Sequence, residues 1–229
     1  MRDILLLGTA REKSTRVKDK MTRPFHNTTL FKLYLDKLED INKTKKPFNN
    51  IILALNKEDK KLLESAKSYN IKIQERSYFS ANDASLPKDV FHYLDEYKEK
   101  YVMWVNGCLP FLKLKTIIDA GNYFIEHKNI NSLHCVKVRQ NWFWNPNANY
   151  PFNLEKTSDL TTQQSLPIYE SVHCFHIHKI EDIIEKNRFW SFKKNDPYLH
   201  MLKDSVEFFD IDTQTEFNIA ELIWRNENE

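Results

Sequence analysis

Residues 5–25 read LLLGTAREKSTRVKDKMTRPF, and this stretch decides how the rest of the chain is interpreted. A short apolar run, typical of a buried strand, passes into a segment that holds six basic and only two acidic side chains. In an α/β protein, a positive loop at the end of the first strand is a place where a polyanion binds. A solvated basic turn would have the same composition, so that alternative stays open.

The composition of the whole chain limits the classes of function. Its 229 residues suffice for one domain with a sizeable core. The 34 basic and 32 acidic residues almost cancel, so attraction for anions is local and no nucleic-acid partner is expected. No segment approaches the roughly 18 apolar residues of a membrane span, and the first apolar run is too short for a signal peptide, so we expect a cytoplasmic protein. The three widely spaced cysteines suit reduced core thiols: Cys108, Cys135 and Cys174.

Strand-like and helix-like segments alternate along the chain. This order predicts an α/β fold with a mostly parallel sheet that is covered on both faces. Strands are expected at 4–7, 51–55, 71–74, 101–105, 132–138, 172–178 and 206–209. Helices are expected at 29–41, 59–69, 88–98, 114–126 and 180–187, and from a capping box of Thr213 and Glu216 onward. Ligands of such sheets bind at the carboxyl ends of the strands, so the loops after Leu7, Gln74 and Val105 should share one edge.

The alternation stops at residues 140–167, QNWFWNPNANYPFNLEKTSDLTTQQSLP. This stretch is rich in asparagine, proline and aromatic residues and has no clear period, which indicates an excursion from the sheet. We interpret the chain as a single domain, residues 1–229, with an arm or lid at about 140–170.

The basic loop is a candidate phosphate site of an unusual kind. Loops that bind nucleotide phosphates usually use glycines, because their backbone N–H groups then approach the phosphates closely. This chain has only three glycines, Gly8, Gly107 and Gly121. Phosphate binding would therefore depend on the side chains of Arg11 and Lys20, helped by the hydroxyl groups of Ser14 and Thr15.

A pair of acidic residues near the end of the chain is a candidate metal site. In FFDIDTQTEF, residues 208–217, Asp210 and Asp212 would project to the same side if the segment is a strand. Paired carboxylates suit a hard divalent cation such as Mg²⁺, or Mn²⁺, that also bridges substrate phosphates. Alternatively, Asp212 only adds charge near a helix N-terminus and Asp210 is exposed.

Two other motifs have weaker chemical interpretations. In VHCFHIH, residues 172–178, Cys174, His176 and His178 would lie on one face of a strand and resemble a zinc ligand set. Ligands from one extended strand diverge, however, so packed histidines are the favoured alternative. Cys108 is a possible nucleophile, but nothing near it in the sequence provides a base, and a buried thiol is favoured.

Taken in order, these features resemble the cytidylyltransferases that make CMP-sialic acid and CMP-KDO, and the resemblance runs from end to end. The family opens with a strand and a pattern of the form ARGGSKGIPRKN, and AREKSTRVKDKM, residues 10–21, keeps Arg11, Ser14 and Lys20 in register with it. The family then has an arginine followed seven residues later by an aspartate near the cytosine and ribose. Arg76 and Asp83 keep this spacing.

The later motifs of the family also occur in order. NGCLPFL, residues 106–112, corresponds to the central PTSPL or QGDEPLI motif, and Gln164 matches a glutamine before Leu-Pro. The closing DID motif and its AE pair match Asp210, Asp212, Ala220 and Glu221. The chain departs from the family at four positions: Glu12 and Lys13 replace two glycines, Ser77 replaces a proline, and Cys108 stands where the KDO type has a metal-binding aspartate.

The resemblance implies a three-layer Rossmann-like nucleotidyltransferase fold and a reaction in which an acceptor oxygen attacks the α-phosphate of CTP and releases pyrophosphate. In the implied site, Arg11 and Lys20 are catalytic and hold the β- and γ-phosphates. The other implied nucleotide-binding residues are Ser14, Arg76, Asp83 and Asn106. Mg²⁺ would be held by Asp210 and Asp212.

The resemblance also implies an acceptor and a partner. The acceptor would be an acidic sugar, such as a sialic acid, another nonulosonate or a KDO-like acid, activated for surface glycan biosynthesis. Its carboxylate would meet Gln164 or Arg139, with Lys137 as a further candidate. The excursion resembles the family's dimerisation arm in position, so a homodimer is expected. An intramolecular flap is the alternative.

Two other functions remain open at this level. Glycosyltransferases that use nucleotide sugars have a similar order of strands and helices and an aspartate pair for Mn²⁺. Their pair usually lies in the middle of the chain, whereas Asp210 and Asp212 lie within twenty residues of its end. The loss of the two glycines also fits a catalytically inactive relative with a binding role.

Overall fold

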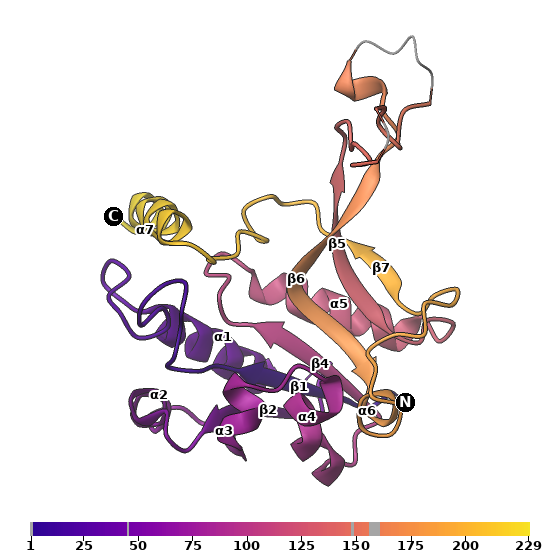
Figure 1. Ribbon diagram of the computed structural model, residues 1–229. Helices are drawn as coiled ribbons and strands as arrows, with labels where there is room; N and C mark the ends of the chain where they lie inside the picture. Colours follow the sequence, from indigo (N-terminus) through magenta and orange to yellow (C-terminus); the bar gives the residue numbers. More distant parts are fainter. Residues whose placement is uncertain (1, 45, 148, 156–160) are drawn as a thin grey trace.

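A mixed β-sheet forms the centre of the protein (Figure 1). The computed structural model describes residues 2–44, 46–147, 149–155 and 161–229, and in these ranges the sheet has seven strands in the order β3-β2-β1-β4-β6-β5-β7. The strands are β1 (Ile4–Thr9), β2 (Asn50–Asn56), β3 (Lys72–Arg76), β4 (Tyr101–Asn106), β5 (Leu133–Arg139), β6 (Ile168–Lys179) and β7 (Tyr198–Met201). Only β6 runs against its neighbours, so the prediction of a mostly parallel sheet is confirmed.

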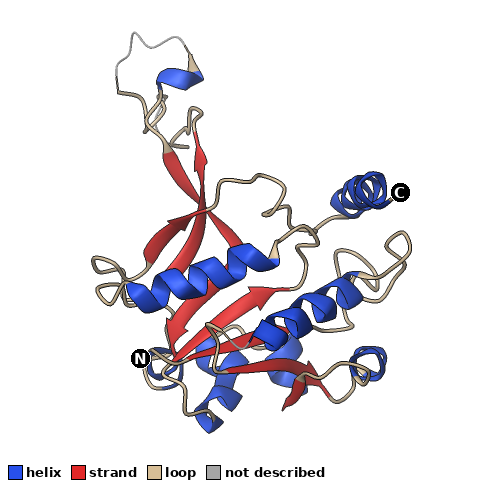
Figure 2. Cartoon of the chain, turned by 180° about the vertical axis from the view of Figure 1, so that it is seen from behind, coloured by secondary structure: helices blue, strands red, loops and turns tan. Residues whose placement is uncertain are grey.

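Helices cover both faces of the sheet. The α-helices are α1 (Leu30–Thr44), α2 (Lys60–Ala66), α3 (Tyr78–Asn82), α4 (Pro87–Phe91), α5 (Leu114–Glu126), α6 (Ile180–Ile184) and α7 (Gln214–Asn228), and the 3₁₀ helices are η1 (His92–Glu96) and η2 (Thr162–Gln164). Helices α1 and α5 lie on one face (Figure 2), and α3, α4 and α6 lie on the other (Figure 1). None of the helices in the described ranges is both long and apolar enough to cross a membrane.

Strand β1 explains why both faces must be covered. Ile4 and Leu6 pack into the cluster under α1 and α5, whereas Leu5 and Leu7 pack into a second cluster with side chains of η1 and α6. All four side chains are fully buried. A continuous apolar run is what a strand of a doubly covered parallel sheet requires, so the fold-class prediction is confirmed from its first element onward.

Some predicted elements are wrong. The expected strand at 206–209 is a turn, in which the Val206 N–H donates to Asp204 Oδ1 and the Phe209 N–H to the Val206 carbonyl. The last strand is instead β7, which has four residues and pairs with β5 only. The helix expected at 88–98 is divided into α4 and η1, and α3 was not predicted. These elements are each four or five residues long, too short for a periodic apolar pattern.

The predicted helix starts are supported by hydrogen bonds. The Thr29 hydroxyl accepts from the Lys32 N–H at 3.1 Å at the start of α1. The capping box of Thr213 and Glu216 is present at the start of α7. The prediction of reduced cysteines is also confirmed: all three thiols are free, and two of them are buried while Cys108 is half-buried.

The expected arm leaves the sheet at the ends of β5 and β6 and extends away from the body of the protein (Figure 1). Residues 148 and 156–160 of this stretch lie outside the described residues. Asn153 organises the base of the arm and is buried. Its side chain accepts from the Phe143 N–H and donates to the carbonyl groups of Asn141 and Leu166, at 2.7–2.9 Å.

A row of buried histidines crosses β5 and β6. The Nδ1 atoms of His134 and His176 lie 2.6 Å apart, and the His176 ring stacks on Trp104. Burial lowers the pKa of His134 to about 4 and that of His178 to about 3. The expectation that Cys174 shares their face is wrong: the β5–β6 pairing shifts register after His134, and Cys174 packs into the cluster under α1 and α5. No group of three metal-binding side chains is present in the described ranges. The burial and stacking of these rings agree with the alternative of packed histidines.

We expect acid to destabilise the protein through this row. In the unfolded chain His178 titrates near its ordinary pKa of 6.5, whereas in the fold it stays neutral to about pH 3. Between these values the unfolded state binds more protons, so the free energy of unfolding falls as the pH falls, by about 3 kcal/mol at pH 4 for His178 alone. Urea unfolding measured from pH 7 to pH 4 tests this. His178→Gln should flatten the pH dependence, and His92→Gln, at an exposed histidine, should not; an unchanged slope in His178→Gln would contradict the assignment.

Candidate active site

A pocket of about 400 Å³ lies at the carboxyl ends of β1, β3 and β4. The loops after these three strands therefore share one edge, as predicted. Seven of the eight residues that the resemblance predicts for the nucleotide and metal sites line this pocket: Arg11, Ser14, Lys20, Arg76, Asn106, Asp210 and Asp212. Thr15 and Cys108, which the sequence also singled out, line it too. The early basic loop and the late acidic pair thus lie across one opening, although about 190 residues separate them.

Side chains hold the basic loop in place of the missing glycines. The Glu12 N–H donates to Asp59 Oδ1 at 3.1 Å, and the Glu12 carboxylate accepts from the Lys61 N–H at 3.0 Å, at the start of α2. Lys13 Nζ donates to the Tyr78 hydroxyl at 2.7 Å. Glu12 and Lys13 therefore tie the loop to α2 and α3.

Arg76 ties the same loop to β3. Its side chain is buried, and Nη2 donates to the Ala10 carbonyl at 2.7 Å. Within the described residues its Nε has no hydrogen-bond partner. Burial lowers the pKa of Arg76, and the guanidinium forms part of the pocket wall. An arginine fixed in this way offers a preorganised donor to a ligand.

Lys20 links the basic loop to the acidic segment. It is 8% exposed and donates to the Ile211 carbonyl at 2.5 Å, and its Nζ lies 3.8 Å from Asp212 Oδ1. Arg16 also contacts Asp212, at 2.9 Å. The Ile211 N–H donates to the Cys108 carbonyl at 3.3 Å, which fixes the segment next to β4.

The aspartates lie in irregular backbone rather than in the predicted strand, yet both face the pocket. Asn106 Nδ2 donates to Asp210 Oδ2 at 3.1 Å. Burial, with a smaller effect of the Asp212 charge, raises the pKa of Asp210 to about 6. The alternative of an exposed Asp210 is therefore wrong.

The donor set fits a hard divalent cation. Two neighbouring carboxylates, one with a raised pKa, form a site that a cation stabilises by neutralising them. In the described ranges no third His, Cys, Asp or Glu joins them in a metal-binding group. The remaining ligands of Mg²⁺ or Mn²⁺ would then be water and phosphate oxygens, as is usual for Mg²⁺ in phosphate-transferring sites.

The pocket has an excess of positive charge. Five cationic side chains line it, against the two aspartates, which gives +3 when both aspartates are ionised. The cationic residues are Arg11, Lys13, Arg16, Lys20 and Arg76. This excess suits a polyanion, so the pocket supports the phosphate interpretation of the loop more than the solvated turn.

Tyr34 sets the spacing of the backbone at the pocket floor. Its hydroxyl donates to the Val105 carbonyl at 2.7 Å, and its ring lies against Gly107. A Cβ on Gly107 would come within 2.7 Å of the ring, and one on Gly8 within 2.8 Å of the hydroxyl. These two glycines therefore serve close packing behind the pocket rather than phosphate contact.

Four predicted residues do not line the pocket: Asp83, Lys137, Arg139 and Gln164. Lys137 forms an ion pair with Glu170 at 3.1 Å. Asp83 is exposed at the C-terminal end of α3. Arg139 forms an ion pair with Glu170 where the arm begins, and Gln164 completes a capping box with Thr161 at η2, within the arm. A single chain does not bring these residues to the pocket. Asp83 belongs to α3, and the others belong to β5 and to the arm, which extends away from the body of the protein (Figure 1).

Sequence reasoning missed Thr9, Trp104 and His173, which line the pocket. Thr9 and Trp104 lie at or near the carboxyl ends of β1 and β4, and the Trp104 Nε1–H donates to Thr9 Oγ1 at 2.9 Å. Their position at strand ends was a usable signal. No such signal marks His173 in the sequence, since the register shift in β6 decides to which face its side chain points.

Comparisons with known proteins bear on the fold. No protein-family model matches the chain, and no curated protein does. Among solved structures, a CMP:2-keto-3-deoxy-manno-octonic acid synthetase complexed with CTP is similar with a TM-score of 0.67 and 8% identity, over 98% of this chain and 99% of that one. A 4-diphosphocytidyl-2C-methyl-D-erythritol synthase from Anaerococcus prevotii DSM 20548 is similar with a TM-score of 0.66 and 12% identity, over 98% of this chain and 99% of that one.

A cytidylyltransferase from Leptospira borgpetersenii serovar Hardjo-bovis (strain JB197) is similar with a TM-score of 0.61 and 17% identity, over 100% of this chain and 96% of that one. All three similarities extend over nearly the whole length of both chains. This chain therefore has the α/β fold of the cytidylyltransferases.

Proposed function

We propose that this protein is a CTP-dependent cytidylyltransferase, which transfers CMP to an anionic acceptor and releases pyrophosphate. The observation that carries the proposal is the convergence of the basic loop and the Asp210–Asp212 pair on one pocket. The fold, which this chain shares with enzymes that use CTP, supports the same conclusion. In the finer form of the proposal, the acceptor is an acidic sugar, a sialic acid, another nonulosonate or a KDO-like acid, activated for surface glycan biosynthesis.

In the proposed reaction the protein acts by positioning and by neutralising charge, since phosphoryl-type transfers need little covalent help. Arg11 and Lys20 hold the β- and γ-phosphates, and Ser14 adds a hydroxyl donor. Arg76 and Asn106 contact the nucleoside side of CTP. Asp83 remains a prediction from the resemblance, because it would have to approach the pocket from the end of α3.

Asp210 and Asp212 hold the divalent cation in this proposal, and Asn106 orients Asp210. When bound, Mg²⁺ or Mn²⁺ supplies charge neutralisation and polarises the α-phosphate. Arg16 and Lys20, which contact Asp212 directly, keep that carboxylate turned toward the pocket.

We also propose a homodimer built on the arm. Three aromatic side chains of the arm are more than half exposed: Trp144 at 58%, Tyr150 at 63% and Phe152 at 59%. Aromatic rings gathered on a projecting segment are typical of a protein interface. The arm of one copy would then bring Arg139 and Gln164 to the acceptor side of the other copy's pocket.

Pyrophosphate release with CTP, Mg²⁺ and a panel of acidic sugars and phosphonates tests the reaction. We expect turnover with at least one acceptor, and Asp212→Asn should lower kcat roughly 100-fold because it removes charge that holds the metal and phosphates. Asp204→Asn, at a surface aspartate outside the pocket, should have no effect. Release of a nucleoside diphosphate from a nucleotide sugar would instead indicate a glycosyltransferase. Stabilisation by CTP and Mg²⁺ without turnover would indicate an inactive relative.

Arg76→Ala tests the nucleotide-binding role of the buried guanidinium. We expect the KM for CTP to rise about tenfold or more, since a preorganised charged donor is lost. Steady-state kinetics measure this, and thermal unfolding shows whether the variant is folded. Arg225→Ala, on the exposed side of α7, is the matched control. Unchanged CTP kinetics in a folded Arg76→Ala protein would remove the role.

The double variant Trp144→Glu/Tyr150→Glu tests the arm. It should convert the dimer into a monomer, because it places charge in an apolar interface, and sedimentation equilibrium measures the change. Phe192→Glu, at a residue that is 81% exposed outside the arm, should leave the assembly intact. A wild-type protein that sediments as a monomer at micromolar concentration would contradict the dimer.

A further inference from the structure

A second hollow, of about 200 Å³, adjoins the nucleotide pocket on the α4–α6 face of the sheet. Trp104 and His173 line both cavities, so the two cavities adjoin at these side chains. We call this hollow the apolar chamber. It is lined by Leu7, Phe91, Val102, Trp104, His173, His176, His178, Ile183 and Phe189.

The chamber contrasts with the pocket in charge. Its lining residues, all within the described ranges, include no Asp, Glu, Lys or Arg. Burial lowers the pKa of His176 and His178, so both rings are neutral at pH 7. Both nitrogens of His176 have partners, since Nδ1 contacts His134 and Nε2 contacts Nδ1 of His173, and Nδ1 of His178 contacts the Phe189 carbonyl. The chamber therefore offers apolar contact and few hydrogen bonds.

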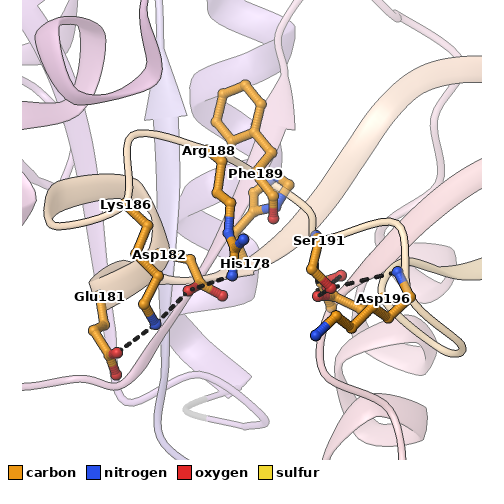
Figure 3. Close-up of polar contacts among 10 residues, drawn as sticks. His178, Glu181, Asp182, Lys186, Arg188, Phe189, Ser191 and Asp196 are labelled. Carbon is orange, nitrogen blue, oxygen red and sulfur yellow. Dashed lines mark hydrogen bonds and ion pairs between the residues drawn. The ribbon is translucent and has the colours of Figure 1, made fainter.

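Polar contacts hold the segment after α6 on both sides of Phe189, one of the residues that line the chamber (Figure 3). Before Phe189, the Arg188 N–H donates to the Asp182 carbonyl at 3.0 Å, and the Asp182 carboxylate pairs with Lys186 at 2.8 Å. After Phe189, the Ser191 N–H donates to Asp196 Oδ2 at 3.1 Å. Phe189 is thus fixed against the His178 ring, with centroids 4.6 Å apart, and closes a preformed space.

Size and polarity define what the chamber accepts. A dry cavity of about 150 Å³ lined by apolar side chains is large enough for benzene, so this chamber holds one aromatic ring or a short alkyl or acyl chain. A polyhydroxylated ring would lose hydrogen bonds to water there without replacement, which is costly. An apolar group would gain from its transfer out of water.

We propose that the apolar chamber binds an apolar substituent of the acceptor, an aromatic ring or a short alkyl or acyl chain, while the reacting oxygen of the same anionic molecule lies in the nucleotide pocket. The observation that carries this inference is the lining shared by the two cavities at Trp104 and His173, because adjoining cavities let one small molecule reach into both. The inference rests on the proposed function, because the ligand is an acceptor only in that reaction. It narrows the substrate class to anions that carry an apolar group.

Binding of benzyl phosphate, compared with methyl phosphate, tests the chamber by isothermal titration calorimetry. The pocket is first saturated with a CTP analogue whose α,β-bridge is methylene, and the titration is repeated without nucleotide. We expect benzyl phosphate to bind at least about tenfold more tightly, from burial of its ring. Ile183→Phe fills the chamber and should remove this preference, and Phe189→Ala removes a wall and should reduce it severalfold. Phe192→Ala, in the same segment but outside the chamber, should keep it.

Equal affinity of the wild-type protein for benzyl phosphate and methyl phosphate overturns the inference. A preference for benzyl phosphate that is unchanged in folded Ile183→Phe and Phe189→Ala proteins overturns it as well. The outcome is separate from that of the proposed function. Suppose that the wild-type protein fails to bind CTP, yet without nucleotide it binds benzyl phosphate more tightly than methyl phosphate and loses this preference in the chamber variants. The cytidylyltransferase assignment then fails, and the chamber stands as an apolar ligand site. If CTP turnover is observed without a ring preference, only the chamber inference fails.

Discussion

The contact of Lys20 with the segment 210–212 is the constraint on which the rest of the site depends. A buried ammonium group is costly unless polar groups surround it, and here the Ile211 carbonyl and the Asp212 carboxylate do so. This contact joins positions 191 residues apart and brings the basic loop and the acidic pair together. Packing of Phe25 against Phe217 of α7 supports the same closure from outside the pocket.

The site combines two chemically different halves. On one side, a loop held by Glu12, Lys13 and Arg76 replaces a glycine cradle with fixed side chains and an excess of positive charge. On the other side, neutral histidines and aromatic rings enclose an apolar space. The two halves adjoin at Trp104 and His173. The protein therefore presents a charged region suited to a nucleotide next to an uncharged region suited to a different part of a ligand.

Much of this organisation follows from local sequence pattern. The apolar run of β1 and the helical spacing of α1 and α5 identify buried faces directly, and the capping box of α7 fixes its start. The motif order predicted eight nucleotide and metal residues, and seven of them line one pocket. The pattern failed where elements are very short, as in α3 and β7, and where a turn at 206–209 has the apolar character of a strand.

By itself the sequence determined the α/β class, the buried strands and the types of side chain available for a phosphate and metal site. The physical reason is that periodic apolar residues indicate buried faces and runs of charged residues indicate exposed loops. Only the tertiary structure decided which of those residues meet. It joined Lys20 to Asp212, left Asp83, Arg139 and Gln164 outside the pocket, and turned His176 and Cys174 to opposite faces through a register shift. It also built a chamber from β1, β4, β6 and the segment after α6. Convergence of this kind depends on contacts between residues tens to hundreds of positions apart, which no local periodicity encodes.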